Sequence, residues 1–269
     1  MMRKVINILL LFSLAVFLIG YPVWAMYYES SRINVNLPLG FRSAADESPL
    51  VRRQGIYFFD FPPTGNAEAR ALPELQSEAG SSASPTLILV NKDNGVAPTY
   101  VPPDLRVPKV PFSFTKVLPH KKMAAEAAVA LEKLFDQAKE EGIILVGVSG
   151  YRPYVYQKAV HKWNVRAVGK KNALKTSAPP GYSEHQTGLA MDLSTPYLHY
   201  KLDERFGDTK AGHWIAAHAS EFGFIIRYPQ GKEKITGYQY EPWHIRFVGE
   251  EHARKIAAAD LTLEEYLNN

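Results

Sequence analysis

Two short stretches of the sequence hold residue types that bind divalent metal ions in proteins. GYSEHQTGLAMDL (181–193) contains His185 and Asp192, separated by a run of small and apolar residues. The tetrapeptide EPWH contains Glu241 and His244. A catalytic zinc ion commonly takes three protein ligands from His, Asp and Glu and keeps one position for water. His185, Asp192 and His244 are therefore candidate ligands, and Glu241 is a candidate general base.

These side chains can meet only if the local backbone brings them together. If His185 lies on a loop and Asp192 on the strand that follows, a bend in the loop brings both to one point. His244 would complete the set from a neighbouring strand. Glu241 and His244 would point to opposite faces of a regular strand. We therefore expect a bend or bulge at Pro242, which cannot donate a ladder hydrogen bond.

The chain resembles the VanY-type zinc D-alanyl-D-alanine carboxypeptidases of the Hedgehog/DD-peptidase group. Four stretches carry the resemblance, in the family's order: LVNKDNGVAPTYVPPDL (89–105), SGYRPYVYQ (149–157), PPGYSEHQTGLAMDL (179–193) and RYPQGKEKITGYQYEPWHIRFVG (227–249). Together they cover most of residues 87–257, and the last two are the most specific. No residue before position 86 belongs to the resemblance.

The resemblance implies a role for each residue of the candidate metal site. His185, Asp192 and His244 correspond to the zinc ligands of the family. Glu241 corresponds to its catalytic base. The implied cofactor is Zn²⁺.

The resemblance also implies roles for three residues beside the metal site. Arg152, in SGYR, corresponds to the arginine that stabilises the oxyanion or holds the substrate. Gln157 and Ser183 correspond to positions near the terminal carboxylate of the substrate. Pro153 departs from the family, whose members often carry Ser or another small polar residue there. This departure leaves the fine specificity open.

The activity implied by the resemblance is removal of the C-terminal D-alanine from D-Ala-D-Ala stem peptides of peptidoglycan. An L,D-carboxypeptidase that trims tetrapeptide stems is an alternative within the same class. A non-catalytic module that binds zinc or peptidoglycan is an alternative from another class. A binding module has no need of a free carboxylate such as that of Glu241, which favours an enzyme.

A serine mechanism is the sharpest chemical rival. Ser113 and Lys116 match Ser-x-x-Lys, the nucleophile motif of penicillin-binding proteins, which also remove D-alanine. That chemistry needs a Ser-x-Asn and a Lys-Thr-Gly as partners. The Ser-x-Asn motif is absent. The nearest match to Lys-Thr-Gly is Lys234-Ile-Thr-Gly, in which an extra Ile interrupts the motif. We therefore expect metal-dependent chemistry.

Composition narrows the function classes further. The chain has 269 residues, 46% of them apolar, and no cysteine. Disulfides, iron–sulfur clusters and thiol catalysis are thereby excluded. The net charge is +4, without a dense run of Lys or Arg, so we do not expect nucleic acid as a partner.

The N-terminus has the layout of a secretory signal. Arg3 and Lys4 precede an apolar run from Val5 to about Ile19. We expect residues 1–28 to be a signal peptide or a membrane anchor. The remainder would then be extracytoplasmic, either secreted or attached to the cell membrane.

The rest of the chain divides by composition. Residues 29–85 include a stretch rich in Ala, Ser, Gly, Glu and Pro, which predicts a weakly ordered linker. A short aromatic run at 55–62 predicts a small strand inside it. We expect residues 86–269 to form the zinc carboxypeptidase domain.

Helices and strands are mixed in this domain without regular βαβ alternation. This pattern favours an α+β fold, with an antiparallel sheet and flanking helices, as in the Hedgehog/DD-peptidase group. Thr262 and Glu265 form a capping box for a last helix. We predict earlier helices at 121–142, 153–169, 211–223 and 250–259, and strands at 87–90, 143–149, 190–194, 224–228 and 244–248.

Overall fold

The computed structural model describes residues 50–53, 56–59 and 85–268. The predicted leader (1–28) and most of the predicted linker lie outside the described residues. Inside the predicted linker, β1 (Leu50–Arg53) pairs antiparallel with β2 (Ile56–Phe59). In the part of the chain that the structure describes, no helix is long and apolar enough to cross a membrane.

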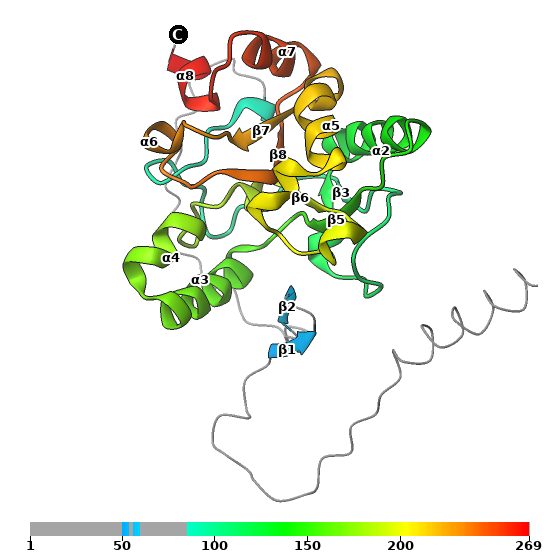
Figure 1. The fold of residues 1–269 in the computed structure, drawn as a ribbon. Helices are drawn as coiled ribbons and strands as arrows, with labels where there is room; N and C mark the ends of the chain where they lie inside the picture. Colours follow the sequence, from blue (N-terminus) through cyan, green and yellow to red (C-terminus); the bar gives the residue numbers. More distant parts are fainter. Residues whose placement is uncertain (1–49, 54–55, 60–84, 269) are drawn as a thin grey trace, which may run out of the picture. The chain divides into compact units, whose positions relative to one another are not determined.

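A four-stranded antiparallel sheet lies at the centre of residues 85–268 (Figure 1). Its spatial order is β5-β6-β8-β7, and each neighbouring pair runs antiparallel. The strands are β5 (Val146–Ser149), β6 (Ala190–Ser194), β7 (Phe224–Tyr228) and β8 (Glu241–Phe247). The predicted α+β class is confirmed, and β6 and β7 have the predicted bounds.

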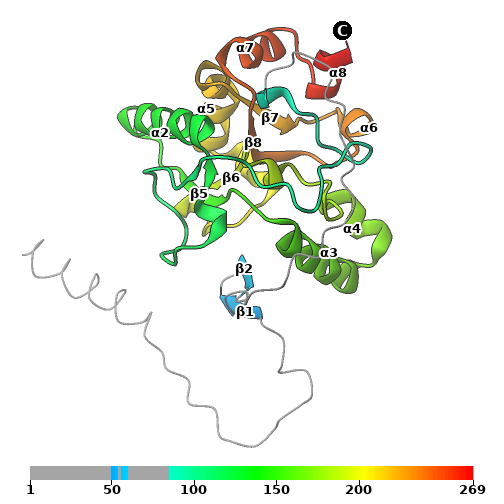
Figure 2. The same cartoon turned by 180° about the vertical axis from the view of Figure 1, so that it is seen from behind.

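Helices surround the sheet. Figures 1 and 2 show α7 and α8 at one end of this region and the pair α3–α4 at the other. The helices are α2 (Ala125–Glu140), α3 (Tyr154–Val168), α4 (Lys170–Thr176), α5 (Lys210–His218), α6 (Glu233–Thr236), α7 (Glu250–Ala258) and α8 (Leu263–Asn268).

Shorter elements connect these parts. Two small strands, β3 (Leu105–Arg106) and β4 (Met123–Ala124), pair antiparallel. The 3₁₀ turns are η2 (Pro85–Leu87), η3 (Pro119–Lys121), η4 (Glu184–Thr187), η5 (Pro196–Leu198), η6 (Glu204–Asp208) and η7 (Ala219–Phe222).

The main core lies between α2 and the sheet. Leu131 and Leu134, three residues apart on α2, are fully buried in one cluster with Leu193 of β6 and Ile245 of β8. Burial of each such side chain contributes roughly 1.5–3 kcal/mol. This packing fixes the two strands that carry Asp192 and His244.

The capping box at the last helix forms as predicted. The backbone N–H of Thr262 donates to Oε2 of Glu265 at 2.8 Å, and the N–H of Glu265 donates to Oγ1 of Thr262 at 3.1 Å. Two otherwise unpaired backbone donors are thereby satisfied.

One expected strand is absent, and one observed helix was not expected. Residues 87–90 do not form a strand, because the Arg246 guanidinium takes the carbonyl oxygens of Thr86 and Ile88 at 2.9 and 2.7 Å. The predicted helix 153–169 is present as α3, but the separate helix α4 that follows was not predicted.

The expected irregularity at Pro242 is present in β8. Ile226 pairs with Ile245, but Tyr228, only two residues on, pairs with Glu241. The register thus shifts opposite the Pro242 segment, as a β-bulge does. The strict alternation of side chains is broken between Glu241 and His244.

Candidate metal centre

The turn η4 positions His185 directly before strand β6. Within the turn, Oγ1 of Thr187 donates to the carbonyl of Glu184 at 2.6 Å and accepts from the Leu189 N–H at 3.1 Å. Gly188 ends the turn in the left-handed conformation, with φ of 70°. A Cβ at this position would also lie 3.0 Å from the backbone N of residue 124. Glycine is therefore required both by the backbone conformation and by the close approach.

His185, Asp192 and His244 meet at one point. Asp192 and His244 are register partners across β6 and β8. Nε2 of His185 lies 3.3 Å from Oδ2 of Asp192, and Nδ1 of His244 lies 2.9 Å from Oδ1. One ligand atom from each of the three residues lies within 4.8 Å of the others, and all three side chains are buried. Two imidazoles and a carboxylate thus converge from a turn and two strands.

The second nitrogen of each imidazole is held by a fixed acceptor. Nδ1 of His185 lies 2.8 Å from the carbonyl oxygen of Gly150, and Nε2 of His244 lies 3.3 Å from Oε2 of Glu184. Because these oxygens can only accept, the protons reside on those nitrogens. Nε2 of His185 and Nδ1 of His244 therefore face Asp192, and each would offer its lone pair to a metal ion once that nitrogen carries no proton. Outer partners of this kind orient metal-ligating histidines.

This donor set fits Zn²⁺. Zinc binds imidazole nitrogen and carboxylate oxygen at about 2.0–2.2 Å, so tetrahedral ligands stand about 3.3 Å apart. The 3.3 Å between Nε2 of His185 and Oδ2 of Asp192 agrees with this spacing, and Nδ1 of His244 lies 2.9 Å from the other carboxylate oxygen, Oδ1. The set supplies three ligands, the number typical of a catalytic site.

The electrostatics around the three side chains favour an anionic carboxylate and a cationic partner. Burial disfavours the charged Asp192, but His185 and His244 outweigh it and hold the pKa of Asp192 far below its usual range. Burial also disfavours the imidazolium of His244, but Asp192 and Glu184 outweigh it and raise the pKa of His244 to about 9. A metal ion would take the place of this proton.

Glu241 opens strand β8 next to the three candidate ligands and is 9% exposed. Burial raises the pKa of Glu241 to about 8, with Asp192 adding to the shift and His244 and Arg152 opposing it. A carboxylate with a pKa near neutrality is suited to exchange protons at physiological pH. Glu241 makes no hydrogen bond to the three candidate ligands among the contacts of the described residues.

Arg152 is built into the same site. Its backbone N–H donates to the carbonyl of His185 at 3.0 Å, and its Nη2 donates to Oγ of Ser149 at 2.9 Å. Nη2 also lies 3.9 Å from Oδ2 of Asp192. The guanidinium is thereby held at the edge of the candidate metal site.

Gln157 contacts Arg152, and Ser183 lies two residues before His185 in the chain. Oε1 of Gln157 accepts from Nη1 of Arg152 at 2.9 Å, and its Nε2 donates to the carbonyl of Ala178 at 2.6 Å. Gln157 therefore contacts Arg152 and the backbone. Ser183 is buried immediately before η4, where its carbonyl accepts from the N–H of Gln186.

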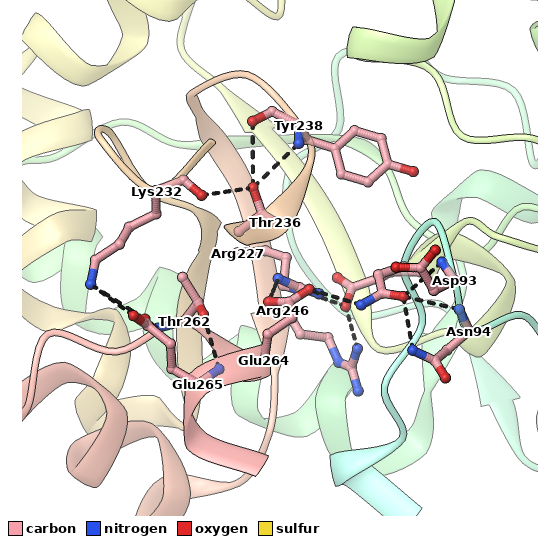
Figure 3. Close-up of polar contacts among 12 residues, drawn as sticks. Asp93, Asn94, Arg227, Lys232, Thr236, Tyr238, Arg246, Thr262, Glu264 and Glu265 are labelled. Atoms are coloured by element: carbon pink, nitrogen blue, oxygen red, sulfur yellow. Dashed lines mark hydrogen bonds and ion pairs between the residues drawn. The ribbon is translucent and has the colours of Figure 1, made fainter. Parts of the chain in front are cut away.

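A buried charge network behind the site was missed from the sequence. Glu184, whose side chain is fully buried, accepts from Nε of Arg227 at 2.7 Å and from Nη1 of Arg246 at 2.5 Å. Arg227 also forms a two-pronged pair with Glu264 of α8, at 2.8 and 2.6 Å. Figure 3 shows Arg227, Arg246 and Glu264 beside the loop of Asn94. A chain of charges thus runs from the C-terminal helix to His244.

The sequence did contain a signal for this network. Arg227 and Arg246 each stand among mostly apolar strand residues, in FIIRY and HIRFV. A guanidinium at such a position needs a buried partner. Glu184 is the carboxylate next to His185 that supplies it.

Two further histidines and the serine motif lie outside the group of candidate ligands. Nδ1 of His218 contacts Glu221 at 2.8 Å, and Nδ1 of His252 contacts the Tyr266 hydroxyl at 2.8 Å. Ser113 and Lys116 lie in a segment without a helix. Neither histidine is part of the group of candidate ligands.

The fold and the site define a peptidase of the Hedgehog/DD-peptidase class. The model of the family VanY, D-alanyl-D-alanine carboxypeptidase, matches residues 120–250. Together with the similarity to relatives given below, this match places the chain in the VanY family.

Three relatives illustrate the similarity. The putative carboxypeptidase YodJ of Bacillus subtilis is 49% identical over 180 residues, which span 67% of this chain and 66% of YodJ. The structure of the LdcB LD-carboxypeptidase has 48% identity and a TM-score of 0.65, covering 67% of this chain and 84% of that one. The structure of a mutant of the vancomycin resistance D,D-pentapeptidase VanY in complex with Zn(II) has 34% identity and a TM-score of 0.57. The match covers 69% of this chain and 100% of that one.

We expect zinc affinity to rise with pH between pH 6 and 8, by up to about tenfold per unit. Over this range His244, with its pKa near 9, carries a proton that the metal must displace. Competition with a chromophoric chelator would measure the affinity, and calorimetry in two buffers would count the released protons. A flat profile without proton release would contradict the assignment.

We expect Glu184→Gln to lower the free energy of unfolding of the zinc-free protein by about 3 kcal/mol. The loss arises because two buried guanidinium groups lose their shared anion. Zinc affinity should fall about 10- to 100-fold as His244 loses its orienting partner. Urea unfolding and chelator competition would measure the two effects.

Glu251→Gln is the matched control, because Glu251 is exposed and its ion pair among the described residues is with Lys255, four residues on. Its effect on unfolding should stay below about 1 kcal/mol, with zinc affinity unchanged. If Glu184→Gln lost stability but kept wild-type zinc affinity, Glu184 would not orient the ligand.

Proposed function

We propose that this protein is a zinc-dependent carboxypeptidase that removes the C-terminal D-alanine from D-Ala-D-Ala stem peptides of peptidoglycan. The observation that carries the proposal is the convergence of His185, Asp192 and His244 beside a buried Glu241. Membership of the VanY family supports the substrate class. The relative that was solved with Zn(II) supports the metal.

The proposed domain and location follow the sequence. We assign the activity to residues 86–269 and propose that residues 1–28 direct the chain out of the cytoplasm, as a cleaved signal or as an anchor. The substrate lies outside the cytoplasmic membrane, which agrees with such a leader. Residues 29–85 would then be a linker.

In the proposed mechanism, His185, Asp192 and His244 hold the zinc ion. Bound zinc supplies a Lewis acid that polarises the scissile carbonyl and makes water more acidic. Glu241 takes a proton from the attacking water as the water oxygen bonds to the carbonyl carbon. Glu241 then returns this proton to the amine of the leaving D-alanine as the C–N bond breaks.

Arg152 offsets negative charge that develops on the carbonyl oxygen or holds the substrate. Its guanidinium is preorganised by Ser149 and Gln157, so little rearrangement is needed during the reaction. Gln157 and Ser183 are proposed to lie near the terminal carboxylate of the substrate. The contacts of Gln157 indicate that it acts through Arg152.

An L,D-carboxypeptidase acting on tetrapeptide stems is a second candidate. The observation that favours it is the similarity to the LdcB LD-carboxypeptidase, which has higher identity and TM-score than the solved VanY mutant. Both reactions release D-alanine and use the same catalytic groups. They differ in the configuration of the residue before the scissile bond.

Defined stem peptides would distinguish the two activities. We expect the zinc-loaded full chain to release one D-alanine from a pentapeptide stem that ends in D-Ala-D-Ala, and a chelator to abolish release. Mass spectrometry would identify the products. Faster release from the tetrapeptide would favour the L,D activity. Absence of release from both peptides would contradict the proposed function.

We expect Glu241→Gln to retain zinc but to lose at least about 100-fold in kcat, because the proton acceptor is removed. His185→Ala should lose both zinc and turnover. Metal analysis and D-alanine release would be measured on the same samples, with Glu251→Gln as control. Near-normal turnover by Glu241→Gln would show that another group is the base.

A further inference from the structure

One region beside the site has a single sign of charge. Residues 150–183 contain seven Lys or Arg and no Asp or Glu. The whole chain has a net charge of only +4, so the remaining residues together are net negative. Positive charge is therefore concentrated in the segment that contains α3 and α4. We call α3 and α4 together the cationic lobe.

The charged side chains of the cationic lobe face solvent. All six that lie on the two helices are exposed, and no ion pair to a carboxylate is found for them among the described residues: Lys158, Lys162, Arg166, Lys170, Lys171 and Lys175. In α3 the first three recur every fourth residue and so follow one face of the helix. Their spacing along the helix axis is about 6 Å.

The cationic lobe contributes little to the hydrophobic core. Gln157 is the buried residue of α3, and Ala173 is the buried residue of α4. Figures 1 and 2 show the two helices side by side, at the end of the domain opposite α7. Core packing therefore does not explain their run of uncompensated cations.

Two contacts join the cationic lobe to the candidate site. At its beginning, Gln157 accepts from Arg152 at 2.9 Å. At its end, the carbonyl of Lys175 accepts from the N–H of Gln239, two residues before Glu241, at 3.4 Å. The lobe is thus joined at both ends to the groups proposed to carry out the reaction, while its row of cations faces solvent.

We propose that the cationic lobe binds a linear phosphodiester polymer of the cell envelope. A polymer with one phosphate per repeat supplies a row of anions for a row of cations at about 6 Å. A stem peptide has too few carboxylates to match six cations. The inference rests on the proposed extracytoplasmic function for the location of this partner.

A lipid surface fits the lobe less well than a polymer. An interfacial helix needs a large apolar face opposite its charges. The large hydrophobic residues exposed on the described part of the lobe are Val155 and Val168, at the two ends of α3. Helix α3 therefore lacks the continuous exposed apolar face that an interfacial helix needs.

Binding of a defined polymer to the full chain tests the proposal. The probe is a fluorescently labelled poly(glycerol phosphate) of about 20 repeats, titrated with the zinc-loaded protein at 50 to 300 mM NaCl. Affinity should fall steeply with salt. The slope of log affinity against log salt concentration should be about −2 to −4, since each phosphate that one of the six cations neutralises releases about 0.7 counterion from the polymer. Vesicles with and without phosphatidylglycerol form a parallel arm.

A triple variant and a matched control locate the binding surface. Lys158→Gln/Lys162→Gln/Arg166→Gln should weaken polymer binding at least tenfold at 100 mM NaCl. The control Lys133→Gln/Lys139→Gln/Lys210→Gln removes the same charge from exposed positions outside the lobe and should change binding less than threefold. Thermal unfolding and zinc content of both variants would verify folding.

Three outcomes would overturn the proposal. They are equal weakening by both triple variants, absence of polymer binding at 50 mM NaCl, and lobe-dependent binding to anionic vesicles without binding to the polymer. The assay requires no turnover. Loss of polymer binding and loss of D-alanine release are therefore separate results, and each tests its own proposal.

Discussion

The buried carboxylate of Glu184 is the constraint on which the rest of the site depends. It contacts Nε2 of His244, Nε of Arg227 and Nη1 of Arg246, all inside the protein. Burial disfavours its charged form, but the two guanidinium groups outweigh this and hold the pKa of Glu184 far below its usual range. The Glu184 carboxylate thereby stays negatively charged beside the imidazole of His244.

This anion links the ends of the domain to the site. Arg246 holds the backbone of residues 86 and 88, and Arg227 holds Glu264 on the last helix. The terminal segments thus complete the surroundings of His244. Buried ion pairs of this kind are weak contributors to net stability, but removal of one partner is costly. We infer that the network serves geometry more than stability.

Several features were predictable because their causes are local. The short stretches AMDLS and FIIRY predicted β6 and β7, and the capping box of Thr262 predicted the last helix, α8. Pro242 indicated the irregularity in β8 because it lacks a backbone donor. The clustering of His185, Asp192 and His244 was expected from residue types together with the family resemblance.

Other features depend on contacts between distant parts of the chain and so escaped prediction. The stretch LILV has a strand-like composition, but the Arg246 side chain, about 160 positions away, donates to the carbonyl of Ile88 within it and to that of Thr86 just before it. The role of Glu184 required Arg227 and Arg246, which come from two different strands. Helix α4 buries only Ala173, so it lacks the apolar periodicity by which helices are predicted.

Anomalous diffraction at the zinc absorption edge, from crystals of the zinc-loaded protein, tests the central claim most directly. The account predicts one strong peak within about 2.2 Å of Nε2 of His185, a carboxylate oxygen of Asp192 and Nδ1 of His244. Glu241 and Glu184 should remain outside bonding distance of that peak. A zinc peak that lacks any of the three ligands, or that is bound by Glu241, would contradict it.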